Sequence, residues 1–151
     1  MIIWIASYPK SGNTWLRSLI SSYYFSKDKF NLSDLKTIPN FSVNDFINNN
    51  LIIQNGVDVA KQWLNVQREI NKNYKKTLFF KTHNACVAIN NNLFTDSDNT
   101  AGCIYVVRDP RNVITSYKNF EKKTYEEILY HMKNKEAYLF SQKKVEFKSF
   151  E

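Results

Sequence analysis

The stretch that decides the fold is Tyr8-Pro9-Lys10-Ser11-Gly12-Asn13-Thr14-Trp15. The apolar run before it, at residues 2–6, is typical of a short buried strand. After it, apolar residues recur at helical spacing over residues 16–24. The stretch is therefore a tight loop between a strand and the N-terminus of a helix. This geometry directs free backbone N–H groups and the positive end of the helix dipole at one point, which predicts a site for phosphate or sulfate.

Three positions in this loop favour an anionic ligand. Lys10 adds a mobile cation, Gly12 lets the backbone approach the anion closely, and Thr14 offers a hydroxyl. The order of residues does not fit the Walker A loop, G-x-x-x-x-G-K-[ST], because Lys10 precedes Gly12 and no glycine comes earlier. An ordinary turn with an exposed lysine is the alternative interpretation.

Residues 8–15 resemble the phosphosulfate-binding loop, Y-P-K-[ST]-G-[TN]-T-W, of the sulfotransferases that use 3′-phosphoadenylyl sulfate (PAPS). The match covers eight consecutive positions. The resemblance implies that Lys10 and residues 11–14 bind the 5′-phosphate of the nucleotide and that Trp15 lies against the adenine. Packing of Trp15 in the core, on the same side of the helix as Leu19, is the competing interpretation.

Length and composition limit the class of protein. At 151 residues and a net charge of +7, the chain is expected to form one domain that binds acidic ligands. The lysines are spread over several segments, so we expect most of them on solvated helix faces and do not expect nucleic acid as a partner. No apolar run approaches the ~20 residues that span a bilayer. We expect a cytoplasmic protein, in which the scattered Cys86 and Cys103 are reduced and structural.

The middle of the chain alternates between helical and strand patterns. Apolar residues at helical spacing predict a helix over residues 57–70, in which Trp63 belongs to the core. Buried strands are predicted at residues 77–82 and 101–107, the second of them apolar on both faces. Residues 90–100 are expected to form a polar loop, or a short helix followed by a turn.

Two further helices are predicted after the last strand. One begins with Asp109 as N-cap and Pro110 at the first helical position. Its core-facing side chains are expected to be Val113, Ile114, Tyr117 and Phe120. The other covers residues 125–138, with His131 on its solvated side.

The segment over residues 26–55 is polar and rich in asparagine. We expect short helices at Ser33 and at residues 43–47. A part of the chain that faces the acceptor substrate is expected here, although the segment contains no recognisable code for a particular acceptor.

The alternation of strands and helices predicts the α/β class. We expect a P-loop-like, three-layer domain with a central parallel sheet flanked by helices. In open sheets of this kind ligands gather at the carboxyl ends of the strands. The loop at residues 8–15, the polar group at residues 81–84, and Arg108 each follow a predicted strand, so we expect them to converge at one edge of the sheet.

A second motif begins at the end of the last predicted strand. Residues 107–117 resemble the 3′-phosphate motif of the same family, in which an arginine ends a strand and a serine follows eight residues later. Arg108 supplies a planar fork for phosphate oxygens, and Ser116 supplies a hydroxyl roughly 10 Å along the helix. The alternatives are an ion pair of Arg108 with Asp109 or Asp96, and a Ser116 hydroxyl bonded back to its own helix.

His83 follows the second predicted strand in the sequence Lys81-Thr82-His83. In the cytosolic-type sulfotransferases a histidine in this setting is the base that acts on the acceptor, and an imidazole pKa near ~6.5 suits that role. The resemblance therefore implies that His83 is the catalytic base. It also implies that Lys10 stabilises charge on the leaving phosphate and that Lys81 assists near the transferred group. A surface or helix-capping histidine is the alternative.

Together these motifs predict transfer of a sulfuryl group from PAPS to a hydroxyl or amine of a small-molecule or glycan acceptor, without a metal. A non-catalytic nucleotide-binding remnant and a P-loop nucleotide kinase are the alternatives. The G-x-x-G-x-W-type loop with which the family closes over the nucleotide has no counterpart in this sequence, and Phe147 and Phe150 have no visible element to pack in. We therefore expect one domain over residues 1–151, truncated before that closing segment.

Overall fold

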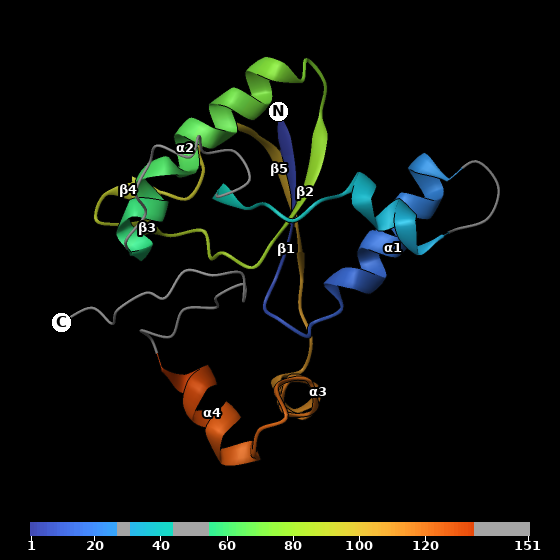
Figure 1. The fold of residues 1–151 in the computed structure, drawn as a ribbon, viewed down its shortest axis with the longest axis vertical. Coiled ribbons are helices and arrows are strands. Elements are labelled where there is room, and N and C mark those ends of the chain that lie inside the picture. Colours follow the sequence, from blue (N-terminus) through green and yellow to red (C-terminus); the bar gives the residue numbers. More distant parts are fainter. Residues whose placement is uncertain (27–30, 44–54, 135–151) are drawn as a thin grey trace.

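The computed structural model describes residues 1–26, 31–43 and 55–134. Its centre is a sheet of three strands in the order β2-β1-β5. They are β1 (Ile2–Ser7), β2 (Leu78–Thr82) and β5 (Thr100–Val106). Both outer strands pair with β1 in parallel, as Figure 1 shows. The predicted α/β class with a parallel sheet is therefore confirmed.

Helices flank this sheet. They are α1 (Asn13–Phe25), the 3₁₀ helix η1 (Leu32–Thr37), α2 (Gly56–Asn73), α3 (Pro110–Glu121) and α4 (Tyr125–Lys133). In Figure 1, α2 lies to one side of the strands and α1 to the other, whereas α3 and α4 lie beyond the carboxyl ends of the strands. The predicted flanking of the sheet by helices is confirmed.

Polar side chains set where the helices begin. Asn55 caps α2, Asp109 caps α3 immediately before Pro110, and Thr124 caps α4. Each of these side chains accepts a hydrogen bond from a backbone N–H that has no partner within the helix. The start predicted at Asp109-Pro110 and the helix predicted over residues 57–70 are both confirmed.

The core lies between the sheet and α2 and is built mainly of aromatic rings. The ring of Trp4 on β1 lies 5.1 Å from Phe41 and 5.0 Å from Phe94, measured between centroids. Trp63 of α2 meets Phe94 edge-on at 5.3 Å, and Phe80 of β2 belongs to the same buried cluster. Edge-to-face rings at these distances are favourable beyond the area they bury. The core position predicted for Trp63 is confirmed.

The register of the sheet brings the carboxyl ends of the three strands to one level. Ala6 pairs with Thr82, the last residue of β2, and Ser7 pairs with Val106, the last residue of β5. Since all three strands run in the same direction, the loops that follow them leave the sheet at the same end, where the carboxyl ends of the strands lie. The convergence predicted for the three polar groups therefore follows from this pairing.

One expectation about the strands is wrong. The last strand was expected to be buried on both faces, but the side chains of Ile104 and Tyr105 are 41% and 65% exposed. Within the described residues β5 pairs with β1 alone and forms an edge of the sheet. An apolar pattern indicates that burial is favourable, but the position of a strand in the sheet decides how much of it is covered.

A β-hairpin takes the place of part of the polar loop expected at residues 90–100. It consists of β3 (Ala88–Ile89) and β4 (Asn92–Leu93), which pair in antiparallel. The two residues between them, Asn90 and Asn91, have φ values of 47° and 62°. Asparagine tolerates this left-handed region better than most residues, and two such residues in sequence close a tight hairpin.

The packing of α3 and α4 against each other corrects two further expectations. Val113 and Tyr117 are buried as predicted and Ile114 is half-buried, but Phe120 is 65% exposed at the end of α3. His131, expected to be solvated, is half-buried, with its ring 6.0 Å from that of Tyr117. Tyr117 of α3 thus contacts α4, whereas the ring of Phe120 contacts the ammonium of Lys10.

Some expectations concern residues that lie outside the described part of the chain. Val43 is buried in the core at 5% exposure, but the rest of the helix expected at residues 43–47 lies outside it. Phe147 and Phe150 also lie outside it. The prediction that the last helix runs to residue 138 is wrong, because α4 ends at Lys133 and its C-cap Asn134 has an extended backbone. The short helix expected at Ser33 is confirmed as η1.

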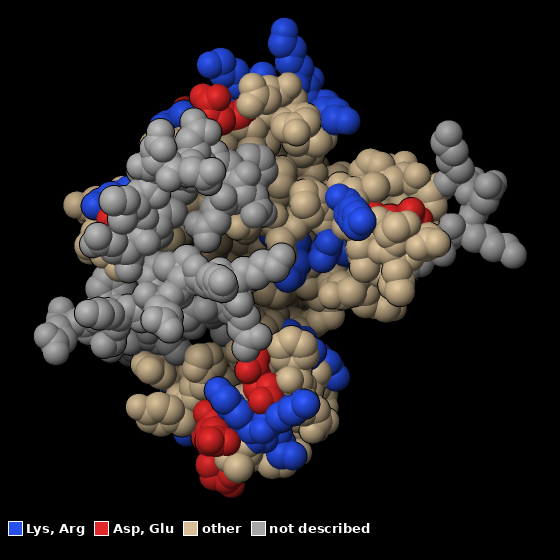
Figure 2. All heavy atoms as spheres, viewed as in Figure 1, with Lys and Arg blue, Asp and Glu red and all other residues tan. Residues whose placement is uncertain are grey.

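The surface carries its positive charge on several elements. In Figure 2 the Lys and Arg side chains appear over α2, near α1 and over the α3–α4 pair, without forming a single band. Among the described residues, none of the helices is both long enough and apolar enough to cross a lipid bilayer.

Gly12 gives a prediction about stability, because its φ of 105° and ψ of 13° lie where a side chain is strained. A Cβ added at Gly12 would meet nothing within 4 Å, so the expected cost of Gly12→Ala is backbone strain alone. We expect the free energy of unfolding in urea to fall by about 1–2 kcal/mol. Gly102→Ala is the matched control: a Cβ there also meets nothing within 4 Å, and Gly102 is not among the positive-φ glycines. Equal effects of the two substitutions would contradict the prediction.

Candidate functional site

The loop between β1 and α1 leaves the first turn of α1 open. Lys10 and Gly12 both have positive φ, 65° and 105°, and the N–H of Ser11 donates to the carbonyl of Tyr8 at 3.3 Å. No side chain caps α1 and its first turn contains no acidic residue. Among the described residues, the N–H groups of that turn therefore have no side-chain acceptor, and the helix dipole adds positive potential at the same place. Such a terminus suits phosphate or sulfate.

Arg108 lies beside this loop. Its Nη1 donates to the carbonyl of Lys10 at 3.2 Å, so the end of β5 is bonded directly to the loop after β1. The alternative partners are both engaged elsewhere: Asp109 pairs with Arg111 at 2.6 Å, and Asp96 accepts hydrogen bonds within its own turn. The ion pair that the sequence left open for Arg108 is therefore not formed, and its guanidinium keeps donors for a ligand.

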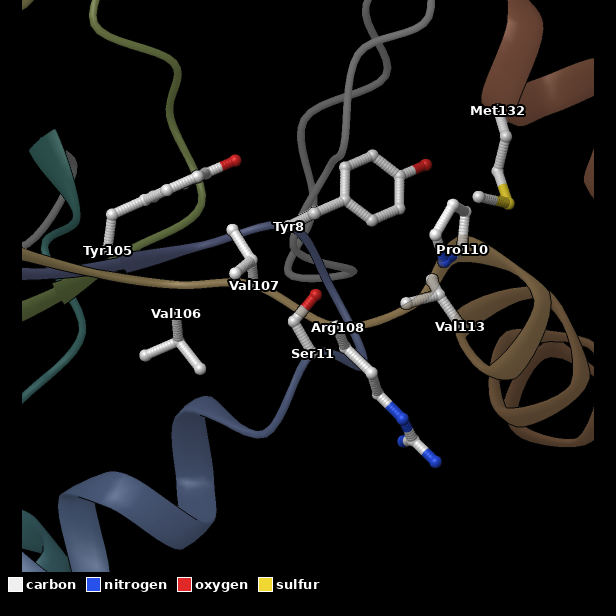
Figure 3. Close-up of a pocket in the computed structure, with 9 residues that line it drawn as sticks. All are labelled: Tyr8, Ser11, Tyr105, Val106, Val107, Arg108, Pro110, Val113 and Met132. Carbon is white, nitrogen blue, oxygen red and sulfur yellow. The ribbon is translucent and has the colours of Figure 1, made fainter.

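A cavity of about 240 Å³ lies between the loop after β1 and the loop after β5. Its apolar part is formed by Tyr8, Tyr105, Val106, Val107, Pro110, Val113 and Met132, and its polar part by Ser11 and Arg108. Figure 3 shows the ring of Tyr8 facing Pro110, Val113 and Met132, whereas the Arg108 side chain extends away from that group. The structure thus brings Ser11 and Arg108, which are 97 residues apart in the chain, to one cavity.

Ser116 is part of α3 and the side chain of Lys10 contacts that helix, but neither residue lines this cavity. Ser116 is half-buried on α3, and no hydrogen bond of its hydroxyl is found among the described residues. The neighbouring Thr115 does bond back to the helix, at the carbonyl of Arg111. The Lys10 ammonium lies 4.1 Å from the centre of the Phe120 ring, a cation–π contact that directs Lys10 toward α3.

His83 is fixed by the end of β1. Its Nδ1 lies 2.6 Å from the carbonyl oxygen of Ser7 and 3.3 Å from the Ser7 hydroxyl. A carbonyl oxygen only accepts hydrogen bonds, so we infer that Nδ1 carries a proton and donates it. In the neutral ring the lone pair is then on Nε2, which is the nitrogen that can accept a proton from a substrate. The alternative interpretation of His83 as a surface or helix-capping histidine is therefore not what is observed.

Burial and the positive charges of two neighbouring residues influence the pKa of His83. Burial lowers the pKa of His83 below its usual 6.5, the hydrogen bond to Ser7 acts in the opposite direction, and the charges of Lys81 and Arg17 lower the pKa further. Burial and the charge of Arg17 likewise lower the pKa of Lys81. The Arg17 guanidinium is held by the carbonyls of Leu35 and Ile38. This region therefore favours a neutral imidazole.

The remaining residues of the predicted loop differ in burial. The side chain of Asn13 is 4% exposed and donates to β1, so only its backbone N–H is available to an anion. Thr14 and Trp15 are exposed, Trp15 by 71%. Packing of Trp15 in the core beside Leu19, which is itself 49% exposed, is therefore excluded. A contact of Trp15 with adenine stays a prediction.

Ser7 and Arg17 belong to this site, although neither was predicted from the sequence. Ser7 immediately precedes the recognised loop, but a serine at a strand end gives no signal that it will hold a distant histidine. Arg17 lies four residues after Asn13, one helical turn further along α1. This spacing could have indicated that Arg17 is on the same face of the helix as Asn13.

No metal site is visible in the described part of the chain. Across residues 1–26, 31–43 and 55–134, no three His, Cys, Asp or Glu side chains come together as possible ligands.

Comparison with known proteins identifies one family. The family profile described as "Sulfotransferase domain" matches residues 2–150. No curated protein matches the sequence.

The environment of His83 gives a prediction about its titration. In the folded chain the His83 ring should titrate below pH 6.5. The pH dependence of the NMR signals of the ring measures this titration. Because the folded state binds this proton less readily than the unfolded state, His83 should also reduce stability as the pH falls from 6.5 through the folded pKa.

A charge substitution tests the cause of the shift. Lys81→Met should raise the pKa of His83, because it removes a nearby positive charge. Lys61→Met is the control, since Lys61 lies on α2 and pairs with Asp58. An unchanged His83 titration in Lys81→Met would show that Lys81 does not act on the imidazole.

Proposed function

The chain belongs to the sulfotransferase domain family, and from this premise we propose that it transfers a sulfuryl group from PAPS to a hydroxyl or amine of a small-molecule or glycan acceptor. The observation that carries the proposal is that an uncapped helix N-terminus lies close to a half-buried histidine whose Nδ1 is already engaged. The first can bind a phosphate, and the second leaves Nε2 as a base.

The residues present fit the nucleotide in three respects. The first turn of α1 has no side-chain cap and no acidic residue, and space is open beside Gly12. Arg108 pairs with no carboxylate of the described residues, and it donates to the loop next to that turn. In the proposal the first turn of α1, with Ser11 and Thr14, binds the 5′-phosphate, and Arg108 with Ser116 binds the 3′-phosphate.

When bound, PAPS supplies a sulfuryl group already attached to a good leaving phosphate. His83 removes the proton of the acceptor hydroxyl or amine through Nε2, while the Nδ1 proton stays bonded to the carbonyl of Ser7. The lowered pKa of His83 keeps this ring neutral at physiological pH, which is the form a base requires.

The two lysines supply positive charge where negative charge builds up. Lys10 stabilises the leaving phosphate, and for this its ammonium must leave the Phe120 ring on which it rests. Lys81 lies at the end of β2, two residues before His83, and assists near the transferred group.

The role of Arg108 can be tested by comparing two nucleotides. Arg108→Ala should weaken binding of adenosine 3′,5′-bisphosphate by about 2 kcal/mol, roughly 30-fold, because a charge-assisted contact is lost. Binding of adenosine 5′-phosphate should change little, since it lacks the group that Arg108 recognises. Calorimetry measures both.

Arg111→Ala is the matched control, because Arg111 is also exposed and lies three residues away, but pairs with Asp109. It should affect neither nucleotide strongly. An equal loss for both nucleotides in Arg108→Ala would refute the assignment of Arg108 to the 3′-phosphate.

The base is tested by turnover in a sulfuryl-transfer assay with PAPS. His83→Ala should lower the rate by ~10²–10⁴-fold, as expected for loss of a general base, with little change in nucleotide affinity. Lys10→Ala should lower both affinity and rate, because its charge acts on the bound phosphate and more strongly in the transition state.

The pH dependence separates a base from a structural histidine. The wild-type rate should rise with pH through the titration of His83, and His83→Ala should lose that dependence. Full turnover in His83→Ala would mean that another group is the base, and the chain would then fit a nucleotide-binding remnant better.

A further inference from the structure

We infer that Asn13 is a positioning residue that holds the imidazole of His83 through Ser7, so that the phosphate loop and the candidate base form one hydrogen-bonded unit. The catalytic meaning of this unit rests on the proposed function, but the contacts that define it do not. It consists of Asn13 at the start of α1, Ser7 at the end of β1 and His83 after β2.

The orientation of the Asn13 amide is determined by its partners. Nδ2 lies 2.9 Å from the carbonyl oxygen of Ile5 and 3.1 Å from the hydroxyl oxygen of Ser7. The carbonyl of Ile5 can only accept, so the nitrogen and not the oxygen of the amide must face it. Both hydrogens of Nδ2 are then used, and the side chain closes the base of the loop by linking the first residue of α1 to β1.

The oxygen of the Asn13 amide makes this arrangement energetically unfavourable in one respect. Asn13 Oδ1 is buried and has no hydrogen-bond partner among the described residues. A buried oxygen without a partner is unfavourable, and a smaller apolar residue would avoid it. An asparagine suits this position nevertheless, because its side-chain nitrogen donates two hydrogen bonds, whereas a serine or threonine hydroxyl donates only one.

Ser7 transmits this constraint to His83. Its side chain is 3% exposed, so its place is set by its neighbours and not by solvent. Its hydroxyl accepts from Asn13, and the same residue contacts Nδ1 of His83 with its carbonyl at 2.6 Å and its hydroxyl at 3.3 Å. Any shift of Ser7 therefore changes the bond that keeps the proton on Nδ1 and the lone pair on Nε2.

Asn13 therefore contributes both to the first turn of α1, where an anion is expected, and to the position of His83. The backbone N–H of Asn13 lies in the first turn of α1, where an anion is expected, and its side chain fixes Ser7. Loss of the Asn13 amide should leave that N–H in place but free the end of β1. His83 should then sample both neutral forms of its ring instead of one.

The decisive experiment is nitrogen-15 NMR of the histidine rings in the full chain, which contains only His83 and His131. Wild type should show a neutral His83 ring protonated at Nδ1. Asn13→Ala should shift its two ring nitrogens toward the averaged values of a mixture of tautomers, whereas His131 serves as the internal reference.

Asn71→Ala is the matched control. Asn71 also donates twice from Nδ2, to the backbone and side-chain oxygens of Asn99, but it lies on α2. An unchanged His83 ring in Asn71→Ala together with a changed ring in Asn13→Ala supports the inference. Equal changes in both variants, or no change in Asn13→Ala, overturn it.

A second pair of variants keeps the inference testable if Asn13→Ala does not fold. Ser7→Ala removes the hydroxyl that links Asn13 to His83, and Ser7→Thr retains a hydroxyl at the same place. Ser7→Ala should shift the His83 ring nitrogens and Ser7→Thr should restore them. A His83 spectrum of Ser7→Ala identical to that of wild type overturns the inference.

Kinetics then separates the inference from the proposed function. In the sulfuryl-transfer assay, Asn13→Ala should lower kcat between about tenfold and 10²-fold, the size of effect that a small misplacement of a catalytic group produces. The KM for PAPS should change less than kcat. If wild type transfers no sulfuryl group, the proposed function fails, while the NMR comparison still decides whether Asn13 positions His83.

Discussion

The parallel pairing of β1 with strands on both of its edges is the constraint on which the rest of the structure depends. Because β1 has β2 on one side and β5 on the other, the three strands end at one level and their loops share one edge of the sheet. Ser7, the last residue of β1, consequently lies between the phosphate loop and His83. A shift of one residue in either pairing would separate these groups and turn their side chains to the opposite face.

The electrostatics of the site follow from the same arrangement. Arg108 bonds to the loop after β1, while the acidic residue beside it, Asp109, is neutralised by Arg111. On the other side Lys81 and His83 come near Arg17, and burial lowers the pKa of each of the three groups. Among the described residues no carboxylate forms an ion pair with these groups, and buried positive charge without such a partner is costly. Its accumulation beside an uncapped helix terminus favours an anionic ligand.

Much of this organisation could be predicted because it depends on local chemistry. Alternating strand and helix patterns, the Asp109-Pro110 start of α3 and the strand–loop–helix setting of residues 8–15 each follow from a few adjacent residues. The polar hairpin could not be predicted as easily. It depends on Asn90 and Asn91 both adopting positive φ, which asparagine permits without requiring.

By itself, the sequence determined the α/β class, the family and the residues that follow each strand, because hydrophobic periodicity and short motifs are properties of neighbouring residues. Only the tertiary structure decided which of these residues meet. The exposure of Trp15 and Phe120, the bond of Arg108 to the carbonyl of Lys10 and the Asn13–Ser7–His83 unit all depend on contacts across the fold. The imidazole of His83 has its place because the carbonyl of Ser7, 76 residues away in the chain, accepts the proton of its Nδ1. No local pattern encodes a hydrogen bond of that separation, since strand order and register bring the two partners together.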